Sequence, residues 1–205
     1  MLKHVEECKQ LAASLVEAGK NKRIVLFPGG GEIDNYIESY HKKFPLKRDV
    51  FHHTTMLSLD QTGLLFSNFE EDLIPFKSFI ECRRILEQRK VAVFLPSDVV
   101  FGLDPFRYTN RISSDGMALY MGHLLEVAEV VILKSIEGLL DQNKQVIPEI
   151  NFDDFANLKQ DCVDETFPLL AKQSRTPITI LNGLEADRVY KWLTERDLEC
   201  GTLIV

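Results

Sequence analysis

The chain alternates between segments with helical spacing of apolar residues and short, continuous apolar runs. Apolar residues that recur every three or four positions predict helices at 2–18, 32–43, 47–66, 77–88, 113–126, 151–158, 164–172 and 184–193. The short apolar runs predict strands at 24–27, 91–95, 129–133, 178–181 and 201–205, with shorter extended pieces near 73–75 and 145–147. Strands that alternate with helices imply an α/β fold, in which a mostly parallel sheet is covered on both faces.

One long stretch has no periodic pattern. Residues 96–112 contain Pro96, Gly102 and Pro105 and are predicted to be irregular, and loops of this length are often functional. No linker, repeat or low-complexity segment divides the chain. We therefore expect a single domain over residues 1–205.

The composition narrows the class of protein. Hydrophobic residues make up 45% and charged residues 27%, which is usual for a soluble globular protein. The net charge of −7 (24 basic, 31 acidic residues) and the lack of a basic run argue against nucleic-acid binding. No apolar run is long enough for a membrane span or a signal peptide, which predicts a cytoplasmic location. The four cysteines are far apart and lack Cys-x-x-Cys spacing, so we expect reduced thiols.

A glycine turn is the first candidate site. The strand at 24–27 runs into Pro28, Gly29, Gly30 and Gly31, and a helical pattern begins at once. Glycines let a ligand approach the main chain closely, and the unpaired N–H groups at a helix start favour an anion. The turn is therefore a candidate phosphate or carboxylate site. The alternative is a tight connection that binds nothing.

Two further positions carry chemistry suited to phosphate. Ser113, Ser114 and Asp115 open a predicted helix, where they are either capping residues or site residues. Lys134 ends a predicted strand, and the carboxyl ends of parallel strands face the ligand crevice of α/β proteins. Lys134 is thus a candidate for neutralising phosphate charge, with a surface lysine as the alternative.

The order of these motifs resembles the amino acid kinase superfamily, which includes acetylglutamate, aspartate and uridylate kinases. The motifs are Pro28–Gly31, Ser113–Asp115, a strand into Lys134 followed by residues 136–141, and a closing Asn182-Gly183 with Gly201-Thr202. The resemblance covers nearly the whole chain. It implies a three-layer sandwich, ATP with Mg²⁺, a small-molecule acceptor, and a homodimer or larger homo-oligomer.

One branch of the superfamily is nearer in pattern. His52, Met56 and residues 59–63, together with residues 163–168, are similar to the small aminomethyl-furan-methanol phosphate kinases of methanofuran biosynthesis. That branch also occurs in bacteria with one-carbon metabolism. The resemblance implies transfer of a phosphoryl group to an acceptor phosphate or hydroxyl, with a furan-methanol phosphate as the acceptor.

The sequence departs from the family pattern in three places. The family's first strand, with its Lys-x-Gly-Gly-Ser phosphate turn, is not found before residue 2, so either the start is assigned too late or part of the ATP site is lost. Asn110 and Arg111 stand where the furan-kinase branch has Trp-Asp. A lysine that other branches carry in the helix at 164–172 is absent near Phe167, and Lys172 lies a turn away.

The candidate site residues follow from these patterns. We expect Asp115 and Lys134 to be catalytic. The predicted phosphate and acceptor site comprises Gly29, Gly30, Gly31, His52, Asp60, Arg111, Ser113 and Ser114, and the predicted nucleotide side comprises Lys134, Glu137, Gly138 and Asp141. His52 and Asp60 are eight residues apart and so lie near one helix face, but two ligands are too few for a metal site. Mg²⁺ would be held mainly by phosphate oxygens.

Two functional hypotheses remain. The first is an ATP-dependent small-molecule kinase. The second is a catalytically silent relative that binds a nucleotide or metabolite or acts as an assembly subunit. A nucleophilic enzyme has little support, because no Gly-x-Ser-x-Gly and no activated cysteine are present. The glycine turn is not a dinucleotide fingerprint either, because Asp34 occupies the place of the last glycine.

Overall fold

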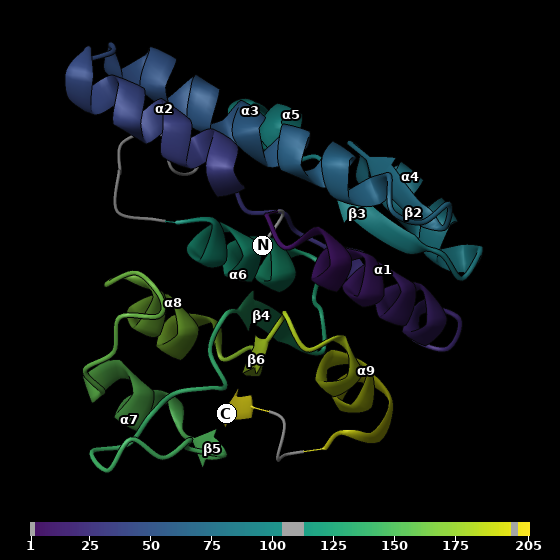
Figure 1. The fold of residues 1–205 in the computed structure, drawn as a ribbon, viewed down its shortest axis with the longest axis vertical. Coiled ribbons are helices and arrows are strands. Elements are labelled where there is room, and N and C mark those ends of the chain that lie inside the picture. Colours follow the sequence, from purple (N-terminus) through teal and green to yellow (C-terminus); the bar gives the residue numbers. More distant parts are fainter. Residues whose placement is uncertain (1–2, 104–112, 198–200) are drawn as a thin grey trace. The chain divides into compact units, whose positions relative to one another are not determined.

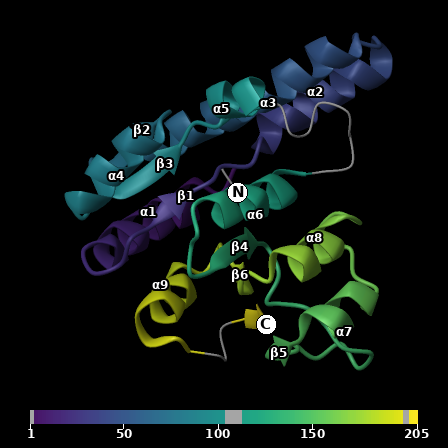
Figure 2. The ribbon, with the colours of Figure 1, turned by 180° about the vertical axis from the view of Figure 1, so that it is seen from behind.

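The computed structural model describes residues 3–103, 113–197 and 201–205 (Figures 1 and 2). The chain divides into two compact units, Met1–Tyr108 and Thr109–Val205, and each is described by itself. Both units combine helices with a small sheet, so the predicted α/β class is confirmed. The single domain over residues 1–205 stays a prediction.

The first unit is built on a parallel sheet. Its elements are α1 (Val5–Gly19), β1 (Val25–Leu26), α2 (Gly31–Lys43), α3 (Arg48–Ser67), β2 (Leu73–Phe76), α4 (Phe79–Glu87), β3 (Val91–Phe94) and α5 (Ser97–Leu103). The strand order is β1-β3-β2, and both pairs are parallel. All four residues of β3 are buried, as expected for a central parallel strand. Helices α2 and α3 run side by side in both views (Figures 1 and 2).

The prediction that residues 96–112 are irregular was wrong for their first part. Ser97–Leu103 forms helix α5, whereas 104–112 lie outside the described residues. The Asp60 carboxylate on α3 accepts hydrogen bonds from the backbone N–H and the hydroxyl of Ser97, at 3.0 and 2.5 Å. This tertiary contact holds the helix start, and a search for local periodicity cannot see it.

The second unit is built on a mixed sheet. Its elements are α6 (Ser114–Leu124), β4 (Val130–Lys134), β5 (Glu149–Ile150), α7 (Phe152–Asn157), α8 (Phe167–Ser174), β6 (Ile178–Asn182), α9 (Ala186–Glu195) and β7 (Gly201–Ile204). The strand order is β4-β6-β7-β5. Strands β4 and β6 are parallel, as are β5 and β7, but β6 and β7 are antiparallel.

The short strand expected near 145–147 was misplaced. Val146 makes only an isolated antiparallel bridge with Leu140, and strand β5 follows at Glu149–Ile150. The Asp141 carboxylate accepts the N–H groups of Asn143 and Gln145, at 2.8 and 2.9 Å. These bonds close a tight turn next to the bridge, so the chain folds back on itself before it reaches β5.

The core of the second unit is centred on two phenylalanines. Phe155 of α7 and Phe167 of α8 are fully buried and meet edge to face, with ring centroids 6.3 Å apart. They pack with apolar residues of the sheet, including Ile178, Ile180 and Ile204. The two short helices therefore belong to the core and are not surface additions. Along the described ranges, no helix combines the length and apolar character needed to cross a membrane.

The packing of Phe155 against Phe167 predicts that removal of the Phe155 ring destabilises the second unit. Phe155→Ala should lower the free energy of unfolding of the second unit by about 3–5 kcal/mol, because the lost aromatic ring leaves a void between α7 and α8. Denaturant titration followed by the fluorescence of buried Trp192, the single tryptophan of the chain, measures it. Leu169→Ala is the control, since Leu169 is 58% exposed. Equal effects of the two substitutions would contradict this account of the core.

Candidate functional site

The predicted site residues fall into two groups, one in each unit. Gly29, Gly30, Gly31, His52 and Asp60 lie in the first unit, and Ser113, Ser114, Asp115, Lys134, Glu137, Gly138 and Asp141 lie in the second. Arg111 lies outside the described residues.

The glycine turn joins the carboxyl end of β1 to the N-terminus of α2. A Cβ on Gly30 would lie 2.5 Å from the Ser58 hydroxyl oxygen, and Gly31 has a φ of +59°. Thr62 donates its hydroxyl to the Gly30 carbonyl at 3.1 Å. The turn is thus packed on α3, and these two glycines are required by the fold itself. The N–H groups of the first turn of α2 lack intrahelical acceptors, which leaves them suited to an anion.

Asp34, in the first turns of α2, is a candidate that the sequence analysis did not include. A Cβ on Gly30 would touch the Asp34 side chain, so this carboxyl lies against the glycine turn. Its Oδ1 is buried and has no hydrogen-bond partner in the described structure. Burial, and secondarily the charge of Glu38, raise the pKa of Asp34 to about 6. An acid close to a glycine turn was visible in the sequence, but its burial was not.

His52 and Asp60 both contact α5. Asp60 binds Ser97 through both carboxylate oxygens, and the His52 ring lies edge-on to the Phe101 ring at 6.5 Å. This agrees with the eight-residue spacing that placed them near one face of α3. In the described structure Asp60 holds α5 in place, and its contact with an acceptor stays a prediction.

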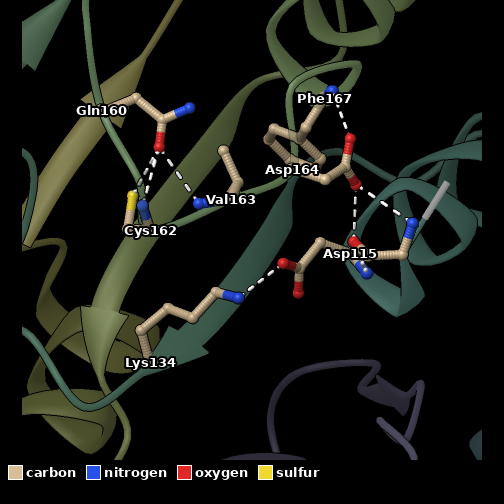
Figure 3. A network of polar contacts seen from close by, with 8 residues as sticks. Asp115, Lys134, Gln160, Cys162, Val163, Asp164 and Phe167 are labelled. Carbon is tan, nitrogen blue, oxygen red and sulfur yellow. Dashed lines mark hydrogen bonds and ion pairs between the residues drawn. The ribbon is translucent and has the colours of Figure 1, made fainter. Parts of the chain in front are cut away.

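In the second unit, Lys134 lies at the carboxyl edge of the sheet. It is the last residue of β4 and pairs in register with Asn182, the last residue of β6. Its ammonium lies 2.5 Å from the carboxylate of Asp115, in the first turn of α6 (Figure 3). The side chains of Lys134 and Asp115 are 26% and 17% exposed, so this ion pair is partly shielded from water. The structure thus brings the two predicted catalytic residues together.

Asp164 fixes the helix that carries Asp115 (Figure 3). One carboxylate oxygen accepts the backbone N–H and the hydroxyl of Ser113, the N-cap of α6. The other accepts the backbone N–H and the hydroxyl of Thr166 and the N–H of Phe167, at the start of α8. Burial alone would raise the pKa of Asp164, but the hydrogen bonds from Ser113 and Thr166 outweigh it and hold the pKa below its ordinary value.

The loop after β4 is held by its own polar residues. The Glu137 carboxylate accepts the Asn182 amide at 2.8 Å and pairs with Arg188 of α9. Gly138 has a φ of +154°, and a Cβ there would lie 2.6 Å from the Thr202 hydroxyl oxygen. The predicted nucleotide-side residues therefore have structural contacts with β6, β7 and α9. A nucleotide contact remains a prediction for each of them.

Asp164 and Asn182 bind predicted site residues, Ser113 and Glu137, but were not predicted to belong to the site themselves. The signal for Asp164 was its position two residues before Thr166 and Phe167-Pro168, because proline is common in the first turn of a helix and the N–H groups there need acceptors. Nearby, the Gln160 side-chain oxygen accepts the N–H groups of Cys162 and Val163 (Figure 3). Burial raises the pKa of the Cys162 thiol, although Lys134 opposes it. That favours a neutral thiol and agrees with the low expectation of nucleophilic catalysis.

Within the ranges described, no group of three or more histidine, cysteine, aspartate or glutamate side chains could hold a metal ion. Binding of Mg²⁺ through the phosphate oxygens of a nucleotide stays a prediction.

Because Asp60 holds the start of α5, its removal should destabilise this helix locally. Asp60→Ala should speed amide hydrogen exchange across residues 97–103, because Ser97 loses both acceptors and the start of α5 is left unpaired. The expected loss is about 1–3 kcal/mol of local stability, measured by exchange and mass spectrometry. The control is Asp98→Ala, on the same helix, which breaks only an exposed ion pair with Lys77. Unchanged exchange in Asp60→Ala would contradict the role assigned to this carboxylate.

The raised pKa of Asp34 predicts a dependence of stability on pH. Between the ordinary value of 3.8 and about 6, the native state binds this proton more tightly than the unfolded state. Stability from this group is therefore present at low pH and is lost as pH rises through 6. Asp34→Asn should be more stable than the wild type at pH 7.5, by about 1 kcal/mol after solvent screening is allowed for. The gain should vanish near pH 4.

Thermal unfolding at several pH values measures this difference. Glu32→Gln is the matched control, because Glu32 is exposed in the same helical turn and should show no gain that depends on pH. A difference between Asp34→Asn and wild type that is constant from pH 4 to 8 would be inconsistent with the pKa assigned to Asp34.

Known proteins resemble this chain over most of its length. The model of the amino acid kinase family matches residues 2–182. The [5-(aminomethyl)furan-3-yl]methyl phosphate kinase of Methanocaldococcus jannaschii is 30% identical over 187 residues, which is 89% of this chain and 85% of that protein. The uridylate kinase of Buchnera aphidicola subsp. Cinara cedri is 26% identical over 199 residues, covering 89% of this chain and 80% of that protein.

Solved structures show the same fold. The uridylate kinase of Archaeoglobus fulgidus superposes with a TM-score of 0.77 at 12% identity and covers 98% of this chain and 93% of that one. The UMP kinase of Ureaplasma parvum has a TM-score of 0.76 at 17% identity and covers 96% of this chain and 88% of that one. The match of the family model, the sequence of the methanococcal relative and the shared fold agree: the chain belongs to the amino acid kinase family.

Proposed function

We propose that the protein is an ATP-dependent small-molecule kinase, which transfers the γ-phosphoryl group of ATP to a phosphate or hydroxyl of its acceptor. The observation that carries this proposal is the pair of Lys134 and Asp115 at the carboxyl edge of the parallel strands β4 and β6. Membership of the amino acid kinase family supports it.

Lys134 supplies positive charge where a phosphoryl group needs it. Phosphoryl transfer depends on positioning and on neutralising charge, with little covalent chemistry left to the protein. An ammonium has three donors, and the ion pair with Asp115 uses one of them. The other donors can therefore bind oxygens of the transferred phosphoryl or of the nucleotide. The partial burial of the pair strengthens such contacts, because water screens them less.

Asp115 acts as a positioning residue in this proposal. Its carboxylate holds the Lys134 ammonium, and it is itself fixed by the first turn of α6. Ser113 caps that turn by accepting the N–H of Asp115, and Asp164 holds Ser113. The chain of contacts gives the lysine a defined place before any phosphate arrives.

The glycine turn is the proposed anion site of the acceptor. Its free helix N–H groups suit a phosphate, and its glycines keep side chains away from the backbone. The acceptor that we propose is a furan-methanol phosphate, because the relative at 30% identity is named for a phosphate of that class. Bound Mg²⁺ would neutralise charge on the phosphates of ATP.

The decisive measurements are ATP binding by calorimetry in the presence of Mg²⁺, followed by phosphoryl transfer to furan-methanol phosphate and to UMP. Transfer to the furan compound, with little to UMP, would support both the reaction and the acceptor. Transfer to UMP alone would support phosphoryl transfer from ATP but contradict the proposed identity of the acceptor. No ATP binding and no transfer would favour the catalytically silent alternative.

The lysine gives the sharpest test of the chemistry. Lys134→Ala should lower kcat by about 10²–10³-fold, because the positive charge of Lys134 stabilises the transition state more strongly than the bound substrates. Lys191→Ala, an exposed lysine on α9, is the control and should leave kcat within about twofold. Asp115→Asn should lower kcat less than Lys134→Ala, since it displaces the lysine without removing its charge. Full activity of Lys134→Ala would overturn the role proposed for this residue.

A further inference from the structure

The carboxyl group of Asp34 has no partner for its charge. Asp34 lies on α2 one turn after Gly30, and helical side chains lean toward the N-terminus, which carries this carboxyl back over the glycine turn. A Cβ on Gly30 would lie 2.4 Å from the Asp34 Cβ and 2.9 Å from its carboxyl carbon. Oδ1 is buried and meets no hydrogen-bond donor among the described residues. The residue as a whole is only partly buried, so a ligand can reach the carboxyl from solvent.

The groups around Asp34 do not supply a donor or a positive charge. The Ser58 hydroxyl lies near the same side of Gly30, but it donates to a backbone carbonyl of its own helix at 2.6 Å. The Thr62 hydroxyl donates to the Gly30 carbonyl at 3.1 Å. Glu38, one turn further along α2, is a second acid, and its charge adds to burial in raising the pKa of Asp34 to about 6. The nearby hydroxyls are therefore already used, and the nearest charge has the same sign.

The helix dipole does not explain this arrangement. An acid in the first turn of a helix is favourable, and Glu32 already provides one there from an exposed position. A role toward the dipole does not require a buried oxygen. Burial of a carboxylate oxygen without a donor costs free energy. Residues that lower stability in this way are characteristic of binding sites.

The position of Asp34 indicates which charge is missing. The N–H groups of the glycine turn suit a phosphate, but an ionised carboxylate beside them repels one. A ligand with a phosphate alone would leave Asp34 unpaired and place two negative charges side by side. A ligand that also carries a positive charge removes both costs.

We propose that Asp34 is a specificity-determining residue of the acceptor site, which binds an ammonium group of the acceptor while the glycine turn binds its phosphate. The inference rests on the kinase function proposed above and names the class of acceptor, a phosphate monoester that carries a primary ammonium group. An ammonium brings three donors and one positive charge, which satisfies the carboxylate through charge-assisted hydrogen bonds. Asp34 takes no proton in the transfer, because a phosphate oxygen is already ionised at neutral pH.

Two probe compounds test the assignment. One is furan-methanol phosphate with an aminomethyl group on the ring, and the other has a methyl group in its place. In calorimetry without ATP, the wild type should bind the amino compound about 10–100-fold more tightly than the methyl compound. Asp34→Asn keeps the shape of the side chain and should bind the amino compound about 10–100-fold more weakly than the wild type. Its affinity for the methyl compound should not fall.

Glu32→Gln is the matched control. It removes an exposed acid from the same helical turn and should keep the preference of the wild type for the amino compound. Thermal unfolding checks that each variant is folded. Loss of the preference in Glu32→Gln as well would overturn the assignment, because any negative charge near the turn would then serve.

The ionisation of Asp34 gives a second readout. Carbon-13 NMR of labelled aspartate carboxyls follows this group, and Asp34→Asn identifies its signal. The pKa of Asp34 should fall from about 6 to about 3–5 when the amino compound binds, because a nearby ammonium favours the carboxylate. The methyl compound should not lower it, since a phosphate alone favours the neutral acid. An Asp34 with a purely structural role would respond alike to both compounds.

The outcomes separate this inference from the proposed kinase function. Equal affinity of the wild type for both compounds, with transfer to both, would support the kinase and overturn the role of Asp34. Equal weakening of both compounds in Asp34→Asn would also overturn that role. Preference for the amino compound without phosphoryl transfer would support the role of Asp34 and contradict the reaction. Binding of neither compound would overturn the proposed acceptor and the role of Asp34 together.

Discussion

The second unit depends on the hydrogen bonds that converge on the Asp164 carboxylate. This one group satisfies the N-cap residue of α6 and the first N–H groups of α8, two sites where a helix has no acceptors of its own. The bonds stabilise its ionised form, so its pKa lies below the ordinary value and the group is charged at neutral pH. Since Asp115 lies in the turn that Ser113 caps, the place of the Lys134 ammonium depends on the same carboxylate.

Carboxylates organise the loops at several strand ends of this protein. Asp60 holds Ser97 after β3, Glu137 holds Asn182 at the end of β6, and Asp141 closes the turn that follows β4. Asp60 and Asp141 accept backbone N–H groups just beyond the strands, which would cost free energy if left unpaired. Glu137 accepts the side-chain amide of Asn182. A candidate chemical role and a structural role are therefore not alternatives at these positions. A group that is already fixed by the fold can also be part of a preorganised site.

The sequence predicted the parts of the fold that depend on local pattern. The helices from α1 to α9 other than α5 were expected within a few residues, because their apolar residues recur with helical spacing. Helix α5 was missed because its start is stabilised by Asp60, 37 residues away. The antiparallel pairing of β6 with β7 was not foreseen either, because a short apolar run carries no information on direction. Of the site, Asp115 and Lys134 were each selected from the sequence pattern and the family resemblance, but their contact was not predicted. The burial of Asp34 was not predicted either, because it depends on packing against the glycine turn.

Helix α2 shows the limit of periodicity as evidence for a core. Its apolar residues recur with the spacing of an amphipathic helix, which identifies a face but not what covers that face. In the structure, the apolar residues of this face differ in their exposure. Ile33 and Ile37 are partly covered, whereas Tyr36 and Tyr40 remain exposed. Aromatic surface in contact with water is unfavourable, so the exposure of Tyr36 and Tyr40 is not explained by the stability of this chain.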